Sequence, residues 1–431
     1  MDRIKIWGVL TTMPKTHIVG AGMAGLAAAV KLSEAGHLVT LYEAASHAGG
    51  RCRSFHDTAL DCVIDNGNHL LLSGNTAVFK FLKTIGAEHT LVGPKEAIFK
   101  FIDVRDGKRW SVRPNMGRIP WWIFCADRRV PRSSWVDYLS ALKLFYASPN
   151  KTLTEILSPS GRLFERYWEP LAVSVLNTPA NQAAASLLWP VFAETFGRGG
   201  YASRPMIARK GLSDSFVDPA ITLLTKHKAK IKFGSRLKRI EKSAGMKHIK
   251  SLVFADQKVS IPKNEAVILA LPASITGSLM TEVKFPAVHN PIVNVHFKLN
   301  LHQPPDSPVN FIGIIGGTAE WLFVRGDIVS ITISAANKHV SKSAEEIINL
   351  TWSDVASALG LDVNTPKQAR VVKEKRATFA QTPESLKLRA KTNTDISNLK
   401  LAGDWTDTGI PATIEGAIRS GYAAADSILN N

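Results

Sequence analysis

The sequence contains little cysteine, and the three cysteines in its 431 residues, Cys52, Cys62 and Cys125, show no CxxC spacing. They supply neither the ligands of a structural zinc site nor a disulfide framework, so we predict no metal and a reducing, cytoplasmic environment. Internal repeats and low-complexity segments are also absent from the sequence. The chain is long enough for two or three globular domains around a large core.

Long apolar runs are missing as well, since none reaches the ~18 uninterrupted residues that a bilayer-spanning helix requires. Residues 1–15 contain only a short apolar stretch, which Lys5 interrupts, and no clear cleavage site follows it. These features do not fit a signal peptide. The sequence thus predicts neither a spanning helix nor export.

Acidic residues are scarce, with 36 Asp and Glu against 53 Lys and Arg and a net charge of +17. Nucleic-acid binding would require a clustered basic motif with interleaved aromatic residues, and the sequence has none, so we predict no nucleic-acid partner. Two explanations of the charge stay open: attraction to an anionic membrane surface, and a surface with many solvated lysines.

A glycine motif lies near the N-terminus, where the pattern is typical of strand, turn, helix and strand. Gly20 permits a tight turn, Gly22 lets the backbone approach a pyrophosphate, and Gly25 lets the helix pack close to the strand. The phosphates would lie at the helix N-terminus, where free N–H groups favour anions. Glu43 closes the following strand and is suited to bond ribose hydroxyls. The predicted dinucleotide contacts here are Gly20, Gly22, Met23, Ala24, Gly25 and Glu43.

A second pair of glycines indicates which dinucleotide binds. Gly49 and Gly50 come shortly after Glu43, and Arg51 follows them. Two glycines allow a second close approach of the backbone, and an arginine can pair with phosphate through two hydrogen bonds. A nicotinamide cofactor needs no second loop, whereas the pyrophosphate of an extended FAD spans both. We therefore predict FAD, with Gly49, Gly50 and Arg51 among its contacts.

The C-terminal part contains a third motif. Residues 399–405 are typical of a strand that enters a turn at Gly403 and Asp404, and Thr413 is a good N-cap for a final helix. The N-terminus of that helix offers free N–H groups to an anion. We predict that Gly403, Asp404, Thr413 and Ile414 contact the cofactor, with Asp404 accepting a hydrogen bond from the ribityl chain.

The scattered motifs predict an interleaved architecture of the α/β class with α+β inserts. A discontinuous, Rossmann-like FAD-binding domain is expected from residues 14–95, 208–284 and 393–431. Residues 96–207 and 285–392 would build a substrate domain of mixed sheet and helices. Hydrophobic periodicity predicts strands over 229–241, 266–272, 292–297, 311–315 and 328–333, and helices over 133–147 and 343–359.

Further stretches carry motifs of their own: Asp65–Leu72, Tyr167–Leu171, Leu176–Pro179, Arg209–Ser213, Asp218–Ala220, Asn294–Phe297 and Ala402–Gly421. Together they resemble the FAD-dependent hydroxysqualene dehydroxylases of hopanoid synthesis, a group within the amine oxidase and phytoene desaturase flavoproteins. The resemblance extends from about residue 16 to 427. The glycine motifs are common to the larger family, and the stretches 65–69 and 411–421 are more specific.

The resemblance implies an enzyme that replaces the allylic hydroxyl of hydroxysqualene with hydrogen, giving squalene. Reduced FAD would deliver hydride from N5 to an allylic cation, and an apolar tunnel would shield that cation from water. Gly67, Asn68 and Leu237 are implied as further cofactor contacts, and the final helix would point at the flavin N1–C2=O edge. The electrons must come from an external donor, because nothing in the sequence identifies a second nucleotide site.

Loss of the hydroxyl also requires an acid, and His69 is the catalytic residue that we predict. A histidine can carry a proton near neutral pH, and His69 lies beside Gly67 and Asn68. A structural histidine hydrogen-bonded beneath the flavin would explain the same position. Tyr167 and Tyr201 are alternative acids.

Segment 119–147 combines apolar aromatic residues, such as Trp121 and Trp122, with Arg128 and Arg129. Aromatic residues beside arginines suit an interfacial anchor, and a nearly insoluble thirty-carbon substrate should enter from a bilayer. The core of the substrate domain would explain the same pattern. We predict a peripheral protein at the inner face of the cell membrane.

Three other functions are compatible with the cofactor motifs. An amine oxidase would place a lysine on a substrate-domain strand near the flavin, and Lys298 lies near such a strand, although the net charge of +17 disfavours a cationic substrate. A carotenoid or phytoene desaturase would use the same flavin in the oxidative direction on a similar polyene. A flavin-binding sensor or scaffold would perform no catalysis.

Overall fold

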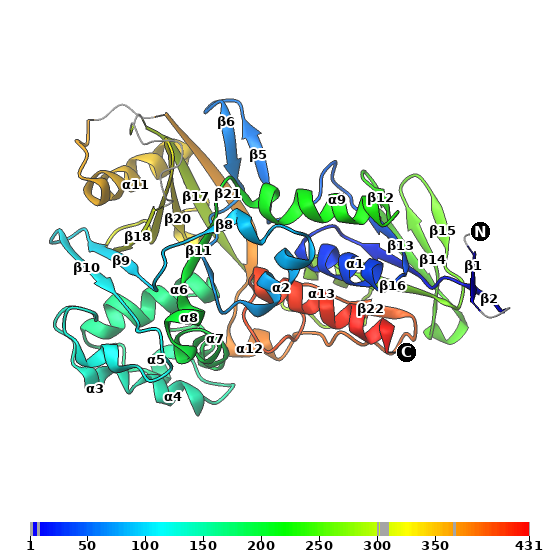
Figure 1. Ribbon diagram of the computed structural model, residues 1–431, viewed down its shortest axis with the longest axis horizontal. Helices are drawn as coiled ribbons and strands as arrows, with labels where there is room; N and C mark the ends of the chain where they lie inside the picture. The colour runs from blue at the N-terminus through cyan, green and yellow to red at the C-terminus, as the bar shows by residue number, and fades with distance from the viewer. Residues whose placement is uncertain (1–2, 7–8, 300, 302–309, 365–367, 431) are drawn as a thin grey trace.

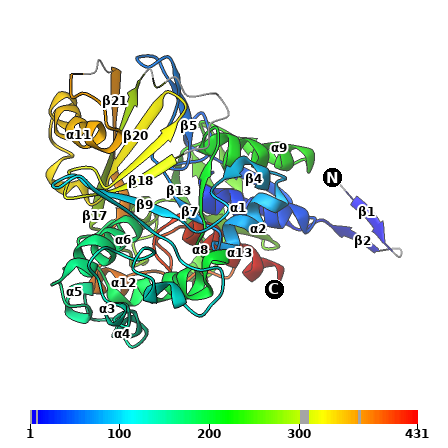
Figure 2. The same ribbon diagram turned by 60° about the vertical axis from the view of Figure 1, so that its left-hand side comes forward.

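The computed structural model of the protein describes residues 3–6, 9–299, 301, 310–364 and 368–430, with side chains in these ranges from Met13 onward (Figure 1). A five-stranded parallel sheet and a seven-stranded mixed sheet dominate the architecture, and a helical region lies beside the mixed sheet. A hairpin of β1 (Arg3–Ile6) and β2 (Val9–Thr12) precedes the first central strand (Figure 2). Within the described ranges, no helix is both long and apolar enough to cross a membrane.

The parallel sheet has the strand order β12-β4-β3-β16-β22, and each neighbouring pair is parallel. The interior strand β16 ends in an apolar run in which Val267, Ile268 and Leu269 are fully buried, as expected of a strand covered on both faces. Helices cover one face, and a three-stranded antiparallel sheet covers the other. The strands are β3 (Lys15–Val19), β4 (Leu38–Tyr42), β12 (Lys230–Lys232), β16 (Glu265–Leu269) and β22 (Leu399–Leu401), with β13 (Leu237–Lys242), β14 (Ile249–Phe254) and β15 (Lys258–Ser260) in the covering sheet.

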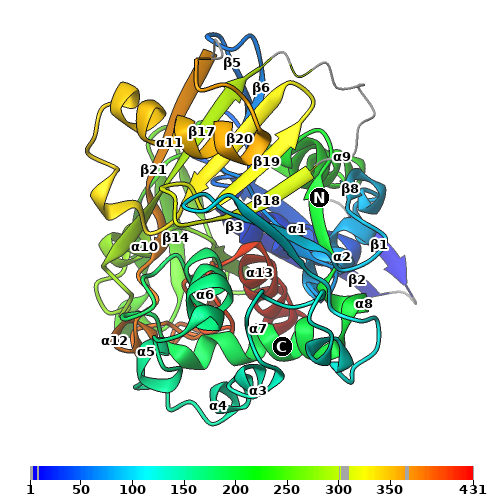
Figure 3. The ribbon, with the colours of Figure 1, turned by 90° about the vertical axis from the view of Figure 1, so that its left-hand side faces the viewer.

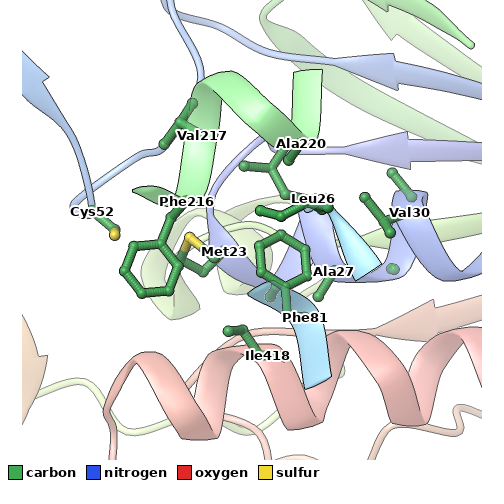
Figure 4. Close-up of a cluster of buried hydrophobic side chains, with 14 of the residues drawn as sticks. Met23, Leu26, Ala27, Val30, Cys52, Phe81, Phe216, Val217, Ala220 and Ile418 are labelled. Atoms are coloured by element: carbon green, nitrogen blue, oxygen red, sulfur yellow. The ribbon is translucent and has the colours of Figure 1, made fainter. Parts of the chain in front are cut away.

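The helical face of this sheet is closely packed. Helices α1 (Met23–Glu34) and α13 (Ile414–Leu429) run side by side, and a Cβ at Gly421 would lie 2.2 Å from the carbonyl oxygen of Ala24 (Figure 1). Phe81 and Phe216 gather around Met23 in the same core (Figure 4). The first and last helices of the fold are therefore in direct contact. The remaining helices of this face are α2 (Thr76–Thr84) and α9 (Asp218–Lys226), whereas α10 (Ala273–Leu279) packs with β13 on the other face.

The seven-stranded sheet has the order β10-β9-β18-β19-β20-β17-β21, and its pairs are antiparallel except for β9 with β18. The predicted strands over 292–297, 311–315 and 328–333 are confirmed. The predicted helix over 343–359 is also confirmed, because α11 (Ala344–Leu359) begins at a capping box of Ser343 and Glu346. The strands are β9 (Phe99–Asp103), β10 (Lys108–Val112), β17 (His289–Lys298), β18 (Asn310–Ile315), β19 (Trp321–Arg325), β20 (Ile328–Ile333) and β21 (Gln368–Phe379).

The helical region contains short helices rather than the single helix predicted over 133–147, so that prediction is wrong in its continuity. A capping box of Ser134 and Asp137 starts α3 (Trp135–Tyr138). The Ser140 hydroxyl then donates to the carbonyl oxygen of Asp137, a local bond that competes with continued α-helix. The helices of this region are α3, α4 (Ala141–Phe145), α5 (Leu153–Ile156), α6 (Glu169–Leu176), α7 (Leu188–Glu194) and α8 (Gly200–Ser203), with α12 (Pro383–Leu386) beside them.

The strand predicted over 229–241 is likewise wrong in its continuity, because it is two strands in two sheets. Gly234 has φ +69°, which turns the chain between β12 and β13. β12 joins the parallel sheet and β13 the antiparallel sheet that covers it. An apolar alternation cannot distinguish one strand from two that continue in different layers.

The parallel sheet takes strands from three distant parts of the chain, namely β3 and β4, then β12 and β16, and finally β22. The α/β class with a mixed-sheet insert is thereby confirmed, and the exact domain limits stay predictions. We distinguish the half of the molecule with the parallel sheet from the half with the mixed sheet and the short helices. Short strands connect these two halves. They are the hairpin of β5 (Ser54–Asp57) with β6 (Cys62–Asp65), and the sheet of β7 (Leu71–Leu72), β11 (Pro205–Ala208) and β8 (Leu91–Val92).

Candidate cofactor site and active site

The first glycine turn follows β3 and is closed on the side of the sheet. Gly20 has φ +105°, and a Cβ there would lie 2.3 Å from the carbonyl oxygen of Ala270. A Cβ on Gly25 would lie 1.8 Å from the carbonyl oxygen of Gly20, so α1 packs closer than any side chain permits. At Gly22, no atom lies within 4 Å of the Cβ position. The turn is therefore open at Gly22, as an approaching pyrophosphate requires.

The N-terminus of α1 is available to an anion. Its N-cap, Gly22, makes no side-chain capping bond, and its first turn has no acidic residue. The first N–H groups of the helix thus lack the acceptor that a serine or aspartate cap would supply. The side chains of Met23 and Ala24 are buried in the core. These two predicted contacts could therefore reach a phosphate only through their backbone.

Glu43 lies directly after β4, beside the first turn. Its carboxylate accepts hydrogen bonds from the backbone N–H groups of Ala21 and Ala45, each at 2.8 Å. Each oxygen keeps a lone pair for a hydroxyl donor, so the carboxylate is held in place and still able to bind ribose. Leu237, another predicted contact, has its side chain buried in the core with that of Val19. Only the backbone of Leu237 could contact a cofactor.

The second glycine loop contacts the first. The N–H group of Gly49 donates to the carbonyl oxygen of Ala21 at 2.8 Å, and Gly22 and Gly49 form a parallel bridge. Gly49 and Gly50 have φ of +102° and +59°, and a Cβ on Gly50 would lie 3.3 Å from the Cα of Gly22. The two loops that are predicted to share one pyrophosphate are therefore adjacent.

Arg51 joins the second loop to the C-terminal motif. Its guanidinium donates to the Asp404 carboxylate at 2.8 Å and to the carbonyl oxygen of Ala377 at the end of β21. The negative charge of Asp404 raises the pKa of Arg51. Two residues that were predicted to bind different parts of FAD, its phosphate and its ribityl chain, are thus paired with each other. A cofactor bound here would have to join or replace this ion pair.

The C-terminal turn leads into α13 as predicted. Gly403 donates its N–H to the Ser420 hydroxyl at 2.8 Å, and Thr413 caps the helix by accepting a hydrogen bond from the N–H group of Gly416. Ile414, the first residue of α13, has a buried side chain. Its contribution to a cofactor site would come from the backbone at the helix N-terminus, where anions are favoured.

A polar cluster connects Asn68 to the mixed sheet. The side-chain amide of Asn68 donates to the Thr332 hydroxyl at 3.1 Å and to the Asn294 side-chain oxygen at 3.4 Å, and Thr332 donates to the same oxygen at 2.9 Å. A Cβ on Gly67 would lie 3.4 Å from the Asn294 side-chain nitrogen. The segment of Gly67 and Asn68 is therefore held directly against β17 and β20.

Asp65 fixes the start of the same segment. Its buried carboxylate accepts hydrogen bonds from the Ser54 hydroxyl at 2.6 Å, the Leu212 N–H at 2.9 Å and the Arg325 guanidinium at 2.9 Å. Ser54 and Leu212 belong to the part of the chain that carries the glycine loops, and Arg325 belongs to β19. Asp65 thus ties the two halves together close to His69.

The two histidines of this region are neutral at physiological pH. Burial lowers the pKa of His69 to about 4, and burial likewise lowers the pKa of His296 to about 4. His296 contacts the Ser330 hydroxyl through Nδ1 at 2.7 Å. Among the described residues, no hydrogen bond involves the His69 ring. His69 therefore cannot be a ready source of a full proton at neutral pH, although its ring retains one N–H donor.

The remaining candidates lie elsewhere. Tyr167 is buried among aromatic rings, which raises its pKa, and the Tyr201 side chain is exposed. The Lys298 ammonium group donates to the carbonyl oxygen of Leu60 at 2.7 Å. Lys298 is four residues after Asn294 on β17, which places the two residues about 13 Å apart along the strand. Lys298 is thus engaged away from the polar cluster, in contrast to the lysine that an amine oxidase would require. Glu415 accepts two backbone N–H bonds at the start of α2 and is structural.

Two residues that the sequence analysis did not single out organise the C-terminal motif. Arg389 donates to the carbonyl oxygens of Asp404, Thr406 and Ile410. Gln381 accepts a hydrogen bond from the N–H group of Ala412, immediately before the Thr413 cap, at 2.9 Å. No local pattern around Arg389 or Gln381 signals these roles, since their partners are backbone groups that only the fold brings near.

The predicted contacts form a chain of neighbours rather than a scattered set. The open Gly22, the uncapped start of α1, the adjacent loop at Gly49 and Gly50 and the ion pair at Asp404 follow one another in space through the contacts above. Such a sequence of phosphate, ribose and ribityl partners fits an extended FAD. The individual contacts to FAD stay predictions.

Comparison with known proteins agrees with this arrangement. The family described as "Flavin containing amine oxidoreductase" matches residues 23–429. A hydroxysqualene dehydroxylase from Zymomonas mobilis is 43% identical over 419 residues, covering 97% of this chain and 100% of that protein. A zeta-carotene desaturase from Solanum lycopersicum is 24% identical and covers 96% of this chain and 81% of that protein. Among solved structures, a putative protoporphyrinogen oxidase from Exiguobacterium matches with a TM-score of 0.69 and 16% sequence identity. The match covers 97% of this chain and 100% of that chain, and at this identity it is evidence for the fold only.

Proposed function

The chain belongs to the flavin-containing amine oxidoreductases and, within them, to the hydroxysqualene dehydroxylase family; from this premise we propose that it reduces hydroxysqualene to squalene. The observation that carries the proposal is the 43% identity to a hydroxysqualene dehydroxylase along nearly the whole chain. The protein is an FAD-dependent oxidoreductase. The desaturase alternative is weaker, because the desaturase relative is only 24% identical.

The proposed reaction breaks one C–O bond and forms one C–H bond. The hydroxyl takes up one proton from the solvent and leaves as water, and the allylic carbon accepts a hydride, so the substrate gains two electrons in total. When bound, reduced FAD supplies that hydride. The two electrons must be restored by an external two-electron reductant. In this scheme the protein has to hold the cofactor, keep water out and assist the departing hydroxyl.

The cofactor would be held by residues of both glycine loops and of the C-terminal motif. The N–H groups at the start of α1 suit the pyrophosphate, and the carboxylate of Glu43 suits a ribose. Arg51 and Asp404 would meet the phosphate and the ribityl chain. The N-terminus of α13 would stabilise negative charge on the flavin.

His69 is proposed to act as a neutral hydrogen-bond donor to the departing oxygen rather than as a charged acid. Its lowered pKa of about 4 favours the neutral ring, and Asn68 next to it is fixed by Thr332 and Asn294. Leu70 and Leu72 follow directly and pack against the aromatic cluster of the helical region. Apolar neighbours of this kind would exclude water from a cation.

The role of His69 is tested by its variants. His69→Gln retains an N–H donor and should keep more activity than His69→Phe. A neutral donor also predicts a turnover rate that changes little between pH 5 and pH 8, because the ring does not titrate there. A turnover rate that falls as the pH rises through 6.5, with equal loss in both variants, would instead indicate a charged imidazolium.

The protein is further proposed to work at the inner face of the cell membrane. The substrate of the proposed reaction is a hydrocarbon that partitions into lipid. Segment 119–147 exposes several large apolar side chains, among them Trp121, Phe124 and Phe145. Monomeric soluble proteins seldom expose so many apolar side chains together.

The decisive experiment is anaerobic. FAD-loaded protein is reduced with dithionite, hydroxysqualene is added in detergent, and flavin absorbance and extracted product are followed together. The expected result is flavin reoxidation with one squalene formed per flavin, and no reoxidation when squalene replaces hydroxysqualene. Persistent reduced flavin without squalene would overturn the proposal. Bleaching of the oxidised protein by phytoene would then assign a desaturase.

A further inference from the structure

Nine large apolar side chains are exposed on the surface formed by residues 119–146, which we call the docking face. They come from the turn before α3, from α3 and α4 and from residues next to these helices, at the lower edge of the molecule in Figure 3. The residues of the docking face are Ile119, Trp121, Phe124, Trp135, Val136, Leu139, Leu142, Phe145 and Tyr146.

The docking face is unusual because α3, α4 and the residue between them expose large apolar side chains next to the exposed polar residues Asp137 and Lys143. Their inward side chains, Tyr138, Ala141 and Leu144, are buried in the aromatic cluster. On the outward side, where a helix of a soluble protein carries polar residues, Leu139 is 45% exposed and Leu142 59%. So many exposed apolar side chains close together are typical of a surface that binds an apolar partner.

Basic groups border the docking face, and its acidic groups are already engaged. The Arg128 guanidinium lies 4.8 Å from the ring centre of Trp121, and Arg129 donates to the carbonyl oxygen of Ile123. Asp127 pairs with Arg113 at 2.5 Å, and Asp137 serves the cap of α3. Aromatic side chains bordered by arginines match the interface of an anionic bilayer, where the rings sit at headgroup depth.

A continuous apolar path leads inward from the docking face. One hydrophobic cluster includes Leu144 of α4 and extends to Leu70 and Leu72, next to His69. Ring contacts follow the same route, with successive centroids 5.0–6.2 Å apart from Phe145 through Trp189, Phe192, Phe196, Phe99 and Phe311 to Trp321.

The inner end of the path meets the polar cluster. Trp321 on β19 is the register partner of Thr332 on β20, so the two side chains share one face of the mixed sheet. Thr332 accepts a hydrogen bond from Asn68 at 3.1 Å. The aromatic path therefore ends beside the residues that flank His69.

The outer end of the path is nearly closed. Beneath the docking face lies an apolar cavity of only about 10 Å³, roughly the volume accessible to one water molecule. Its lining comes from α4, α6, α7 and the turn after α7, namely Leu144, Trp168, Leu171, Leu188, Val191, Phe192 and Phe196. A hydrocarbon does not fit this cavity, so entry at this point would require α4 and α7 to move apart.

We propose that the docking face inserts into an anionic lipid bilayer and that the polyprenoid substrate passes directly from the bilayer between α4 and α7 along the aromatic path. The passage rests on the proposed function, whereas the insertion does not. The gap between α4 and α7 is closed away from lipid, so that water stays out until the docking face has inserted.

Insertion is measured without substrate, by flotation of the FAD-loaded protein with vesicles of equal parts phosphatidylcholine and phosphatidylglycerol. The double variant Leu139→Glu/Leu142→Glu should bind at least about tenfold more weakly, since two exposed apolar side chains no longer enter lipid. Val63→Glu is the matched control, because Val63 is 54% exposed on the distant β6. Equal flotation of both variants would overturn the insertion, as would loss of self-association by the double variant in size-exclusion chromatography, which would assign the face to a second copy of the chain.

Passage is tested by joining α4 to α7. Phe145 and Trp189 are replaced by cysteine in a Cys62→Ser/Cys125→Ser background and linked by a short bismaleimide, which reductants do not cleave. The linked protein should keep its FAD and its reoxidation by oxygen, while reoxidation by hydroxysqualene in vesicles falls at least about tenfold. The same double-cysteine protein without the linker is the control, because it carries both substitutions on the aromatic path.

The results of these experiments distinguish a failure of the proposed substrate route from a failure of the proposed reaction. Undiminished turnover by the linked protein would place the entrance elsewhere. If the unlinked protein fails to form squalene from detergent-dispersed substrate, the proposed function fails, and flotation still decides on insertion.

Discussion

The half of the molecule with the glycine loops and the half with the short helices are held together by different means. In the first, backbone meets backbone, as at Gly25 against Gly20 and Gly421 against Ala24. In the second, such contacts also occur, as at Gly199 against Gly117, but aromatic side chains fill the space between the short helices and form a continuous apolar path. Close contact between backbone segments leaves no room for a different arrangement of those segments, whereas packed side chains can adopt other rotamers. The difference suits a fixed cofactor on one side and a large, flexible hydrocarbon on the other.

The sharpest test of the rigid half compares two glycines of one motif. Gly25→Ala should cost about 3 kcal/mol or more of unfolding free energy, because the new methyl group would lie 1.8 Å from a carbonyl oxygen. Gly22→Ala should change the stability of the FAD-free protein by less than about 1 kcal/mol, because its Cβ position is open. FAD affinity of Gly22→Ala should fall at least about tenfold.

Urea unfolding of the FAD-free proteins and fluorescence titration with FAD measure the two effects. Unaltered FAD affinity in Gly22→Ala would show that the open side of the turn does not receive the pyrophosphate. Equal stability of the two variants would remove the distinction between the closed and the open side.

Asp65→Asn tests the joint between the halves. The substitution removes the charge that faces Arg325 inside the protein, and we expect a loss of about 3 kcal/mol in unfolding free energy. Asp61→Asn is the control, because Asp61 is 88% exposed and its contact with His56 contributes little. Thermal unfolding that separates into two transitions in Asp65→Asn alone would show that this carboxylate couples the halves.

Within the helical half, Leu144→Ala and Leu142→Ala on the same helix separate core from surface. Leu144 is buried, so its truncation should cost about 2–3 kcal/mol. Leu142 is exposed, so Leu142→Ala should lower the free energy of unfolding by less than about 0.5 kcal/mol. Chemical denaturation measures both. Comparable losses would mean that the docking face is part of the stabilising core, contrary to the comparison above.

The smallest expected effect depends on pH. Because burial lowers the pKa of His296 to about 4 from 6.5, the unfolded chain binds an additional proton between these values. The stability associated with the neutral ring is complete above pH 6.5 and is lost as the pH falls toward 4, by about 2 kcal/mol at pH 5. His296→Leu should reduce the loss of stability between pH 7 and pH 5 by about 2 kcal/mol, while the contribution of His69 remains, and His56→Gln, at an exposed site, should leave the loss unchanged.

The half with the glycine loops is predicted best from the sequence, because its motifs depend on residues that are neighbours in the chain. Gly20, Gly22 and Gly25 require only the neighbouring strand and helix, and Thr413 requires only the helix that it caps. The contacts of these residues with FAD stay predictions, although their geometry fits. Local rules also explain why the strands of the mixed sheet and α11 were predicted correctly.

The contributions that the sequence analysis missed are long-range. Arg389 acts on backbone carbonyls that are brought near by β22 and α13, and the pairing of Arg51 with Asp404 joins residues 353 positions apart. The breaks at Gly234 and Ser140 depend on which layer each flanking segment joins. Periodicity carries no information about such choices, since both sides of each break satisfy the same pattern.

The contact of α1 with α13 has a consequence for how the protein is made. Gly421 of α13 packs against the carbonyl group of Ala24 in α1. At about 5–20 residues per second, α13 is translated roughly 20–80 seconds after α1, so this contact can form only then. β22 reaches its place beside β16 equally late. The surface of α1 that α13 covers therefore stays open throughout most of synthesis, whereas β3, β4 and α9 can contact α1 earlier. Slower translation at low temperature should lengthen this exposure, whereas chaperones that cover the early segments should raise the yield of cofactor-loaded protein.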